Sequence, residues 1–302
     1  MSNKAAAWLS AFRLRTLPLA IATIAMGSHL AFLDGQFSWP IAGLTILTAV
    51  LLQLLSNLAN DYGDGIKGTD NENRLGPIRA IQSGILSVNE LRNSMIVFSI
   101  LSLASGCTLL YVVFGATVNL QFVAFFLVGL ASIAAAIKYT AGKNPYGYSA
   151  LGDLSVFLFF GLVAVVGTYY LQTGQFSGLA LLPAMGMGLL STGVLNTNNM
   201  RDIDNDLESG KITVAGKLGK SSSKTYHFIL IIGAMLCFLV YASLRFASAV
   251  QWLFVLAFIP LIIHLLGVKK EHGRALDPEL KKLVLSTLLL SLLWVIPSFF
   301  GG

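Results

Sequence analysis

Residues 40–64, PIAGLTILTAVLLQLLSNLANDYGD, pass from an apolar segment directly into a cluster of amides and carboxylates. The apolar part, 40–57, is long enough to cross a bilayer as a helix that rises about 1.5 Å per residue. Asn57, Asn60, Asp61 and Asp64 form the cluster. An Asp at the centre of a bilayer costs about 2.5–3.5 kcal/mol on insertion scales, so carboxylates at a membrane boundary indicate a functional site.

The remainder of the chain repeats the apolar pattern. Of its 302 residues, 55% are hydrophobic and only 11% are charged, and the mean hydropathy is +0.75. These values exclude an ordinary soluble globular protein. We predict a single all-α domain over residues 1–302, a polytopic membrane bundle of nine spanning helices at 16–33, 40–57, 94–115, 120–138, 151–171, 179–197, 226–244, 250–268 and 283–300.

Basic residues predict how this bundle lies in the membrane. Every Lys and Arg except Arg245 falls on one side of the predicted bundle, and basic residues in short loops mark the cytoplasmic side. The N-terminus is therefore expected in the cytoplasm and the C-terminus outside. The net charge of +6 reflects this topology, so we expect membrane lipid, and no nucleic acid, among the partners.

A second cluster, Asn198, Asp202 and Asp206, follows the predicted sixth helix. On a helix the members of each cluster share one face, and Asp204 points away from that face. The second cluster follows the first after four further helices. This recurrence of the Asn and Asp pattern indicates an internal pseudo-repeat, with two half-sites that meet in one bundle. Carboxylates and amides near basic residues suit Mg²⁺, which takes one or two carboxylates together with substrate phosphates. The alternative is a set of solvated carboxylates at helix ends.

Three motifs carry a resemblance to a known family. They are Asn57-x-x-Asn-Asp61-Tyr-x-Asp64 with Gly65 to Asp70 and Arg74-x-Gly76-Pro77-x-Arg79, Asn198-Asn-Met-Arg201-Asp202-x-x-x-Asp206-x-x-x-Gly210-Lys211-x-Thr213, and Tyr139-Thr-Ala-Gly142-x-x-Pro145-Tyr146-Gly147-Tyr148-x-x-x-Gly152-Asp153. Together they resemble the UbiA superfamily of intramembrane prenyltransferases, and within it the 1,4-dihydroxy-2-naphthoate polyprenyltransferases of the MenA branch. The resemblance extends over most of the chain, from Arg13-x-Arg15-Thr-Leu-Pro18 onward.

The resemblance implies transfer of a polyprenyl group from its diphosphate to 1,4-dihydroxy-2-naphthoate, with loss of the ring carboxylate, in menaquinone biosynthesis. A bacterial inner membrane is the compartment that this pathway implies. By motif position two Mg²⁺ ions would be held against the diphosphate by Asp61, Asp64, Asp202 and Asp206. Support or direct binding of the donor is implied for Asn57, Asn60, Asn198, Arg201, Lys211, Lys138, Arg74 and Arg79.

Two further residues in the third motif are candidates for the acceptor side of the reaction. The ring face of Tyr139 could stabilise an allylic cation, and Asp153 could orient or deprotonate an acceptor hydroxyl. Each has a structural alternative, because a Tyr at a helix end is often an interfacial anchor and an Asp at a helix start favours the positive end of the helix.

Other functions compete with this interpretation. Intramembrane carboxylates and repeated halves also occur in ion-coupled transporters, although the acids here lie at one face and not at the midplane. A CDP-alcohol phosphotransferase is disfavoured because Asp64-Gly65 is not followed by Ala-Arg. Within the resembling family, hydroxybenzoate, homogentisate and phylloquinone-type acceptors remain alternatives, and the third motif favours naphthoate.

Overall fold

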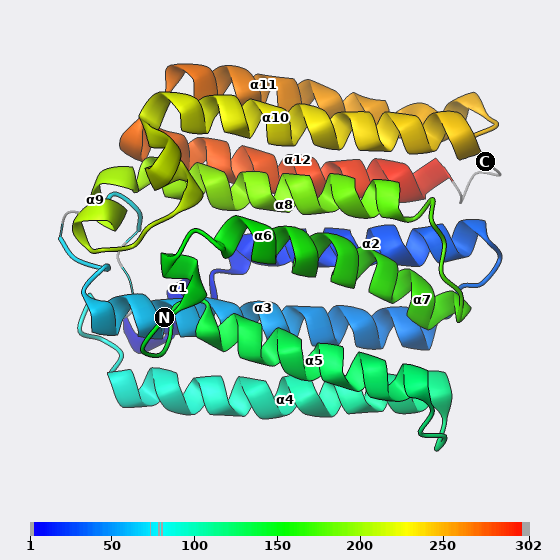
Figure 1. Ribbon diagram of the computed structural model, residues 1–302, viewed down its shortest axis with the longest axis horizontal. Helices are drawn as coiled ribbons and strands as arrows, with labels where there is room; N and C mark the ends of the chain where they lie inside the picture. Colours follow the sequence, from blue (N-terminus) through cyan, green and yellow to red (C-terminus); the bar gives the residue numbers. More distant parts are fainter. Residues whose placement is uncertain (1–2, 73, 78, 80, 298–302) are drawn as a thin grey trace.

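The computed structural model describes residues 3–297 apart from 73, 78 and 80. The described chain is built from helices that run side by side along one axis (Figure 1). They are α1 (Asn3–Phe12), α2 (Leu17–Leu33), α3 (Trp39–Lys67), α4 (Val88–Phe114), α5 (Leu120–Lys138), α6 (Gly152–Val156), the π-helical segment η3 (Phe157–Val166), α7 (Gly167–Thr173), α8 (Leu181–Arg201), α9 (Ile203–Glu208), α10 (Val214–Arg245), α11 (Phe258–Lys270) and α12 (Asp277–Val295), with short 3₁₀ segments η1 (Leu14–Thr16), η2 (Tyr146–Tyr148), η4 (Ala249–Ala257) and η5 (Gly273–Leu276).

The all-α membrane class is confirmed, but the count of nine apolar spans is not. Among the described residues, seven helical segments are long and apolar enough to cross a membrane: Lys4–Leu33, Trp39–Lys67, Val88–Phe114, Leu120–Lys138, Gly152–Thr173, Val214–Arg245 and Ala249–Lys270. The predicted spans 179–197 and 283–300 overlap α8 and α12, and positions 298–300 of the second span lie outside the described residues. The last turns of α8 are rich in Asn and Thr, and α12 begins with charged residues, so neither helix offers a long uninterrupted apolar stretch.

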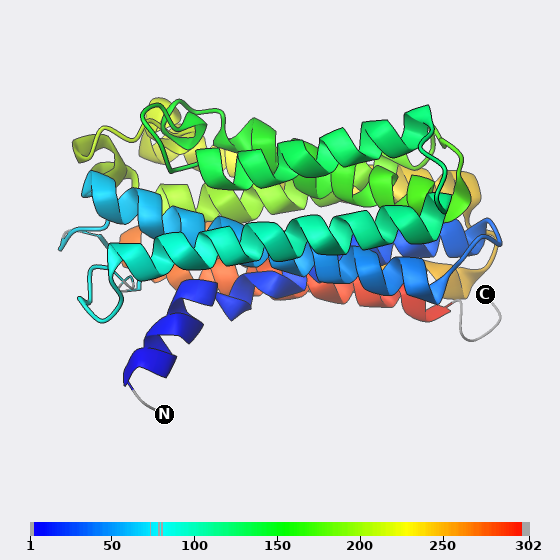
Figure 2. The same cartoon turned by 90° about the horizontal axis from the view of Figure 1, so that it is seen from below.

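One end of the bundle collects the polar connections. The segments that join α3 to α4, α5 to α6, and α8 to α10 all lie at that end, beside α9 (Figure 1). Helix α1 lies at the same end and leaves the bundle at an angle, whereas α12 finishes at the opposite end (Figure 2). The break after α1 falls at Arg13, which has a left-handed backbone (φ 46°). The clusters predicted from the sequence therefore have their loops on one side.

Local signals explain where the helices near this end begin and stop. Helix α4 starts with a capping box, in which the Ser87 side chain accepts from the Glu90 amide and Glu90 accepts from the Ser87 amide. Thr213 caps α10 by accepting from the Gly216 amide at 3.0 Å. Gly68 ends α3 with φ 75°, a conformation that costs glycine little. These caps fix the loops that carry the polar clusters.

Small residues let the central helices pack closely. A Cβ on Gly161 of η3 would lie 2.7 Å from the Ala184 carbonyl oxygen and 2.9 Å from the Gly188 Cα, both on α8. A Cβ on Gly186 would lie 2.7 Å from the ring of Phe238 on α10. Helices in lipid rely on such close approach, because lipid tails are as apolar as the side chains and provide little hydrophobic drive for association. Helix α8 is therefore wedged between η3 and α10.

We expect Gly161→Val to destabilise the bundle by about 1–3 kcal/mol, the range for overpacking, because the clashing atoms belong to the α8 backbone and cannot rotate away. The matched control is Gly43→Val on α3, since a Cβ there meets nothing within 4 Å. Thermal unfolding of both purified variants in detergent measures the difference. Equal melting temperatures for the two variants would show that the η3–α8 contact is not tight.

Candidate active site

The two acidic clusters meet at the side chain of Lys211. Its ammonium lies 3.6 Å from Asp64 Oδ2 and 3.7 Å from Asp206 Oδ1. Asp64 belongs to α3 and Asp206 to α9, so carboxylates from distant parts of the sequence flank one cation. The Asn205 amide also donates to the Thr69 carbonyl oxygen at 2.9 Å. The polar ends of α3 and of the α8–α9 segment therefore form one site.

The two clusters are built differently. Helix α3 continues through Lys67, ten residues beyond the predicted end of its span at 57, so the first cluster lies on continuous helix. Helix α8 stops at Arg201, and Asp202 adopts a non-helical backbone before α9 begins. The expectation of one unbroken helix for the second cluster was therefore wrong. Asp204 is exposed and pairs with Lys220 at 2.7 Å, which agrees with its predicted position away from the site.

Arginines neutralise the carboxylates that are not beside Lys211. Arg13 donates to Asp61, and Arg79 lies 3.6 Å from the same oxygen. Asp70 is paired with Arg74 at 2.9 Å and with Arg79 at 3.7 Å. The α3–α4 loop thus carries its own acid and two arginines, which together form a charged layer over the end of α3.

Burial and charge pairing set the protonation of these groups. Burial raises the pKa of Asp206 to about 6, against the opposing effect of Lys211. Burial disfavours the charge of Lys211, but Asp64 and Asp206 outweigh it and raise the lysine pKa above its ordinary value. Burial also opposes ionisation of Asp202, whereas its bonds with Arg201 hold the net pKa below the usual range. Lys211 therefore remains cationic and Asp202 anionic.

A cavity of about 500 Å³ begins at this charged site and extends between the helices. Leu103 on α4, Phe125 on α5 and Val163 on η3 are among the apolar residues that line its other end. Most of the residues predicted for the site also line it: Asn57, Asn60, Asp64, Arg74, Arg79, Tyr139, Asn198, Asp202, Asp206 and Lys211. The cavity thus has a charged end and an apolar end.

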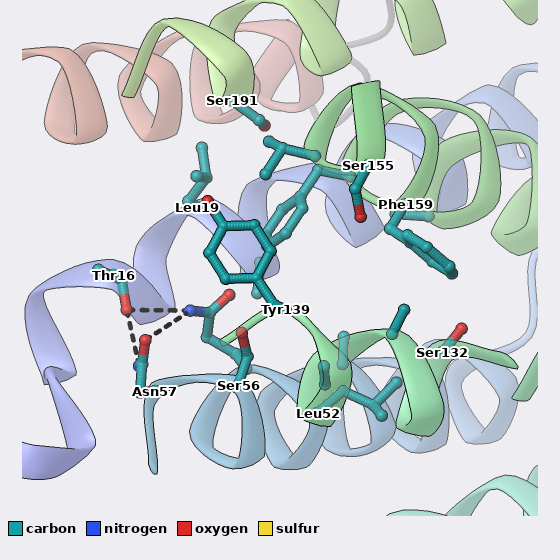
Figure 3. Close-up of a pocket in the computed structure, with 18 of the residues that line it drawn as sticks. Thr16, Leu19, Leu52, Ser56, Asn57, Ser132, Tyr139, Ser155, Phe159 and Ser191 are labelled. Carbon is teal, nitrogen blue, oxygen red and sulfur yellow. Dashed lines mark hydrogen bonds between the residues drawn. The ribbon is translucent and has the colours of Figure 1, made fainter. Parts of the chain in front are cut away.

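The ring of Tyr139 projects into the cavity between Leu19 and Ser56 (Figure 3). Two glycines of the third motif make room for it. A Cβ on Gly147 would lie 2.5 Å from the Tyr139 carbonyl oxygen, and a Cβ on Gly152 would lie 2.8 Å from its hydroxyl. The glycine spacing of that motif is therefore explained by the placement of one aromatic ring beside the charged end.

Asn57 is held by its neighbours at the cavity wall. Its amide nitrogen donates to the Phe12 carbonyl oxygen at 2.9 Å and to the Thr16 hydroxyl at 3.1 Å, and the bond with Thr16 is visible in Figure 3. Its amide oxygen accepts from Gln53 at 3.2 Å. Because both ends of the amide are engaged, Asn57 connects α3 to the break between α1 and α2.

Four predicted residues do not line the cavity: Asp61, Arg201, Asp153 and Lys138. Asp61 lies behind the wall, paired as described above. Arg201 donates to both oxygens of Asp202 (3.0 and 2.5 Å), to Asn198 and to Asp277, so its donors are directed at protein groups. Asp153 accepts from Tyr226 at 3.1 Å, and Lys138 is exposed at the end of α5.

Sequence reasoning assigned no role to four residues that the structure brings to the site. Arg13 and Arg15 line the cavity, Asp70 holds Arg74, and Tyr148 donates to Asp64 at 2.8 Å. All four fall within the motifs that carry the family resemblance, so the signal was present. The sequence does not show how the loops fold, and the fold of the loops decides which polar residue faces which partner.

The carboxylates have the chemistry to hold a hard cation. Asp206, which lines the cavity, has a buried Oδ2 that accepts no hydrogen bond within the described part of the protein. Among the same residues, no three His, Cys, Asp or Glu side chains are grouped as a ready-made metal site. This donor set fits Mg²⁺, which binds through one or two carboxylates and completes its octahedron with substrate phosphates and water.

A membrane bundle with carboxylates and guanidinium groups at one end of an apolar cavity has the design of an enzyme that acts on anionic lipids. The chain belongs to the UbiA prenyltransferase family, whose model matches residues 20–300. It is therefore an integral membrane protein and a prenyltransferase.

Within this family, the chain is similar in sequence to two bacterial enzymes and in fold to two archaeal proteins. The chain is 42% identical to 1,4-dihydroxy-2-naphthoate octaprenyltransferase of Escherichia coli over 98% of this chain and 96% of that protein. It is also 42% identical to the protein of that name from Haemophilus influenzae, over 100% of this chain and 98% of the relative. A UbiA homologue from Aeropyrum pernix shares the fold with TM-score 0.70 at 16% identity, over 94% and 98% of the two chains. The homologue from Archaeoglobus fulgidus solved with GPP and Mg²⁺ has TM-score 0.63 at 17% identity, over 95% and 98%.

Proposed function

We propose that this protein transfers a polyprenyl group from its diphosphate to 1,4-dihydroxy-2-naphthoate. The carbon–oxygen bond of the allylic diphosphate breaks, a carbon–carbon bond forms to the ring, and diphosphate and the ring carboxylate (as CO₂) leave, which gives the quinol form of demethylmenaquinone. The observation that carries this proposal is that one cavity has both a charged end and an apolar end. The two relatives that share 42% identity bear the name of this activity.

The charged end suits the diphosphate head. We assign Mg²⁺ to Asp64, Asp202 and Asp206, which line the cavity, and give Asp61 the task of holding Arg13 and Arg79 in place. A bound Mg²⁺ would neutralise charge on the departing diphosphate. The Archaeoglobus homologue with GPP and Mg²⁺ supports a divalent ion in this fold.

The protein's own cations complete the binding of the leaving group. Lys211, Arg74 and Arg79 line the cavity beside the carboxylates and can donate to phosphate oxygens. Fixed cations that meet negative charge as it develops stabilise the transition state more than the ground state. The ring of Tyr139, in the cavity at this end, faces the region where the allylic cation forms and can stabilise it through its π-face.

The site faces the side of the membrane that carries the basic loops. By the positive-inside rule we place this side, with the N-terminus, in the cytoplasm of a bacterial inner membrane and the C-terminus outside. Both substrates then enter the same site from different phases, since the aromatic acid is water-soluble and the polyprenyl donor is dissolved in lipid.

The function is tested by product analysis. Purified protein is incubated in detergent with an all-trans polyprenyl diphosphate and a panel of aromatic acids, with Mg²⁺ or with EDTA. We expect a prenylated, decarboxylated naphthoquinol by mass spectrometry with dihydroxynaphthoate and Mg²⁺, and loss of product with EDTA. Product from 4-hydroxybenzoate or homogentisate alone would overturn the acceptor assignment. Tight cation binding without diphosphate release from any donor would favour a transporter.

A further inference from the structure

Tyr148 lies where three loops of the site meet. It belongs to the short helical turn η2 in the segment between α5 and α6. Its hydroxyl is 2.8 Å from Asp64 Oδ1 and 2.6 Å from the Thr69 hydroxyl. Its ring lies 5.7 Å from the Lys211 ammonium, on the α9–α10 connection. A single side chain therefore contacts the acid, the cation and the end of the α3 helix.

The direction of these hydrogen bonds follows from the groups involved. An ionised carboxylate can only accept, so the proton of the Tyr148 hydroxyl is directed to Asp64. The short contact with Thr69 must then use the threonine proton, with the Tyr148 oxygen as acceptor. A phenol is protonated at neutral pH, so Tyr148 supplies the proton of this hydrogen bond. The result is a directed chain from Thr69 through Tyr148 to Asp64.

The backbone of the same loop holds the segment that carries Lys211. The amide of Ile212 donates to the Tyr148 carbonyl oxygen at 3.2 Å, and the amide of Ala150 donates to the Ile212 carbonyl oxygen at 2.8 Å. These bonds form a parallel bridge between Ser149 and Ile212. Lys211 is the neighbour of Ile212 in the chain, so its position depends on this bridge.

We propose that Tyr148 is a positioning residue that fixes the Asp64 carboxylate and the Lys211 ammonium relative to each other. The hydroxyl occupies Asp64 Oδ1 and leaves Oδ2 for Lys211. Without the hydroxyl, Asp64 is free to rotate and the acid–lysine pair loses its orientation toward the cavity. Residues that orient the groups around a metal or a diphosphate, and do not touch either, have effects of about 10–100-fold on affinity or activity. This inference rests on the proposed function of the site.

The test is Tyr148→Phe, which removes the hydroxyl and keeps the ring beside Lys211. We expect the affinity for inorganic diphosphate, measured by calorimetry with Mg²⁺ present, to fall about 10–100-fold. We also expect kcat to fall by a similar factor while KM for the naphthoate stays within about twofold, because the lost bond concerns the donor side. Thr69→Val should change the same quantities by less, since it acts through Tyr148. Combining the two substitutions should add little to Tyr148→Phe.

Tyr169→Phe is the matched control. That hydroxyl donates to Asp34 at 2.7 Å on the loop between α2 and α3, outside the cavity, so its loss should leave diphosphate affinity unchanged. Equal effects of Tyr148→Phe and Tyr169→Phe on diphosphate binding would overturn the inference, as would a strictly additive Thr69→Val. Failure of the proposed function is distinguishable, because wild-type protein would then bind diphosphate and form no prenylated product.

Discussion

Asp64→Asn and Asp206→Asn are each expected to lower turnover by roughly 100-fold or more, the range seen when a single charge-stabilising group is removed from an active site. Both side chains line the cavity and flank Lys211. The amide keeps the shape of the carboxylate but loses the charge that binds a divalent ion. Steady-state release of diphosphate from the prenyl donor measures the effect, and thermal unfolding verifies that the variants fold.

Asp204→Asn is the control for this pair. It lies two residues before Asp206, but its side chain is exposed and pairs with Lys220. Exposed ion pairs contribute only about 0–1 kcal/mol, so turnover should stay within about threefold of wild type. Near-normal turnover in both Asp64→Asn and Asp206→Asn would remove the metal–diphosphate assignment. A comparable loss in Asp204→Asn would mean that overall charge, and not the cavity geometry, governs the activity.

The membrane class and the polar end of the bundle were predictable because both follow from residues that are close together in the sequence. Long apolar stretches report spans directly, and a carboxylate at the end of a span is costly enough to stand out. The count of spans was less predictable, since α8 ends in amide and hydroxyl residues and α12 begins with charged ones, so their apolar stretches are interrupted. The motifs predicted which residues belong to the site, and most of these residues line the cavity.

The roles within the site depend on tertiary contacts that no spacing encodes. Arg201 resembles a phosphate ligand in the sequence, yet its guanidinium is directed to Asp202 and Asp277. The α8–α12 contact that places Asp277 there joins residues 76 positions apart. Lys138, predicted to bind phosphate, ends α5 on its exposed side. The helix that ends at Lys138 was predicted correctly, whereas α8 continues four residues past the predicted end of its span at 197. The direction of the Arg201 side chain is set by Asp277, a distant partner.

Gly106→Phe and Gly129→Phe are expected to make the enzyme discriminate against long prenyl donors. The two glycines line the cavity on α4 and α5. A Cβ at either position meets nothing within 4 Å, and neither glycine has a positive φ. Helix packing and backbone geometry therefore do not explain them, unlike Gly161. Leu103 and Cys107 also line the cavity, and both are exposed.

We expect each of these two variants to lower kcat/KM for a C40 donor by about 10–100-fold, the equivalent of the 1–3 kcal/mol cost of overpacking, and to leave a C10 donor within about threefold. A short tail ends before the added ring, whereas a long tail must pass it. Gly43→Phe is the matched control, since Gly43 also has open space around it but lies outside the cavity lining. A uniform loss for both donors would indicate misfolding. Unchanged kcat/KM for the C40 donor in both variants would mean that the tail leaves the charged end by another route, and the apolar end of the cavity would then have no part in donor selection.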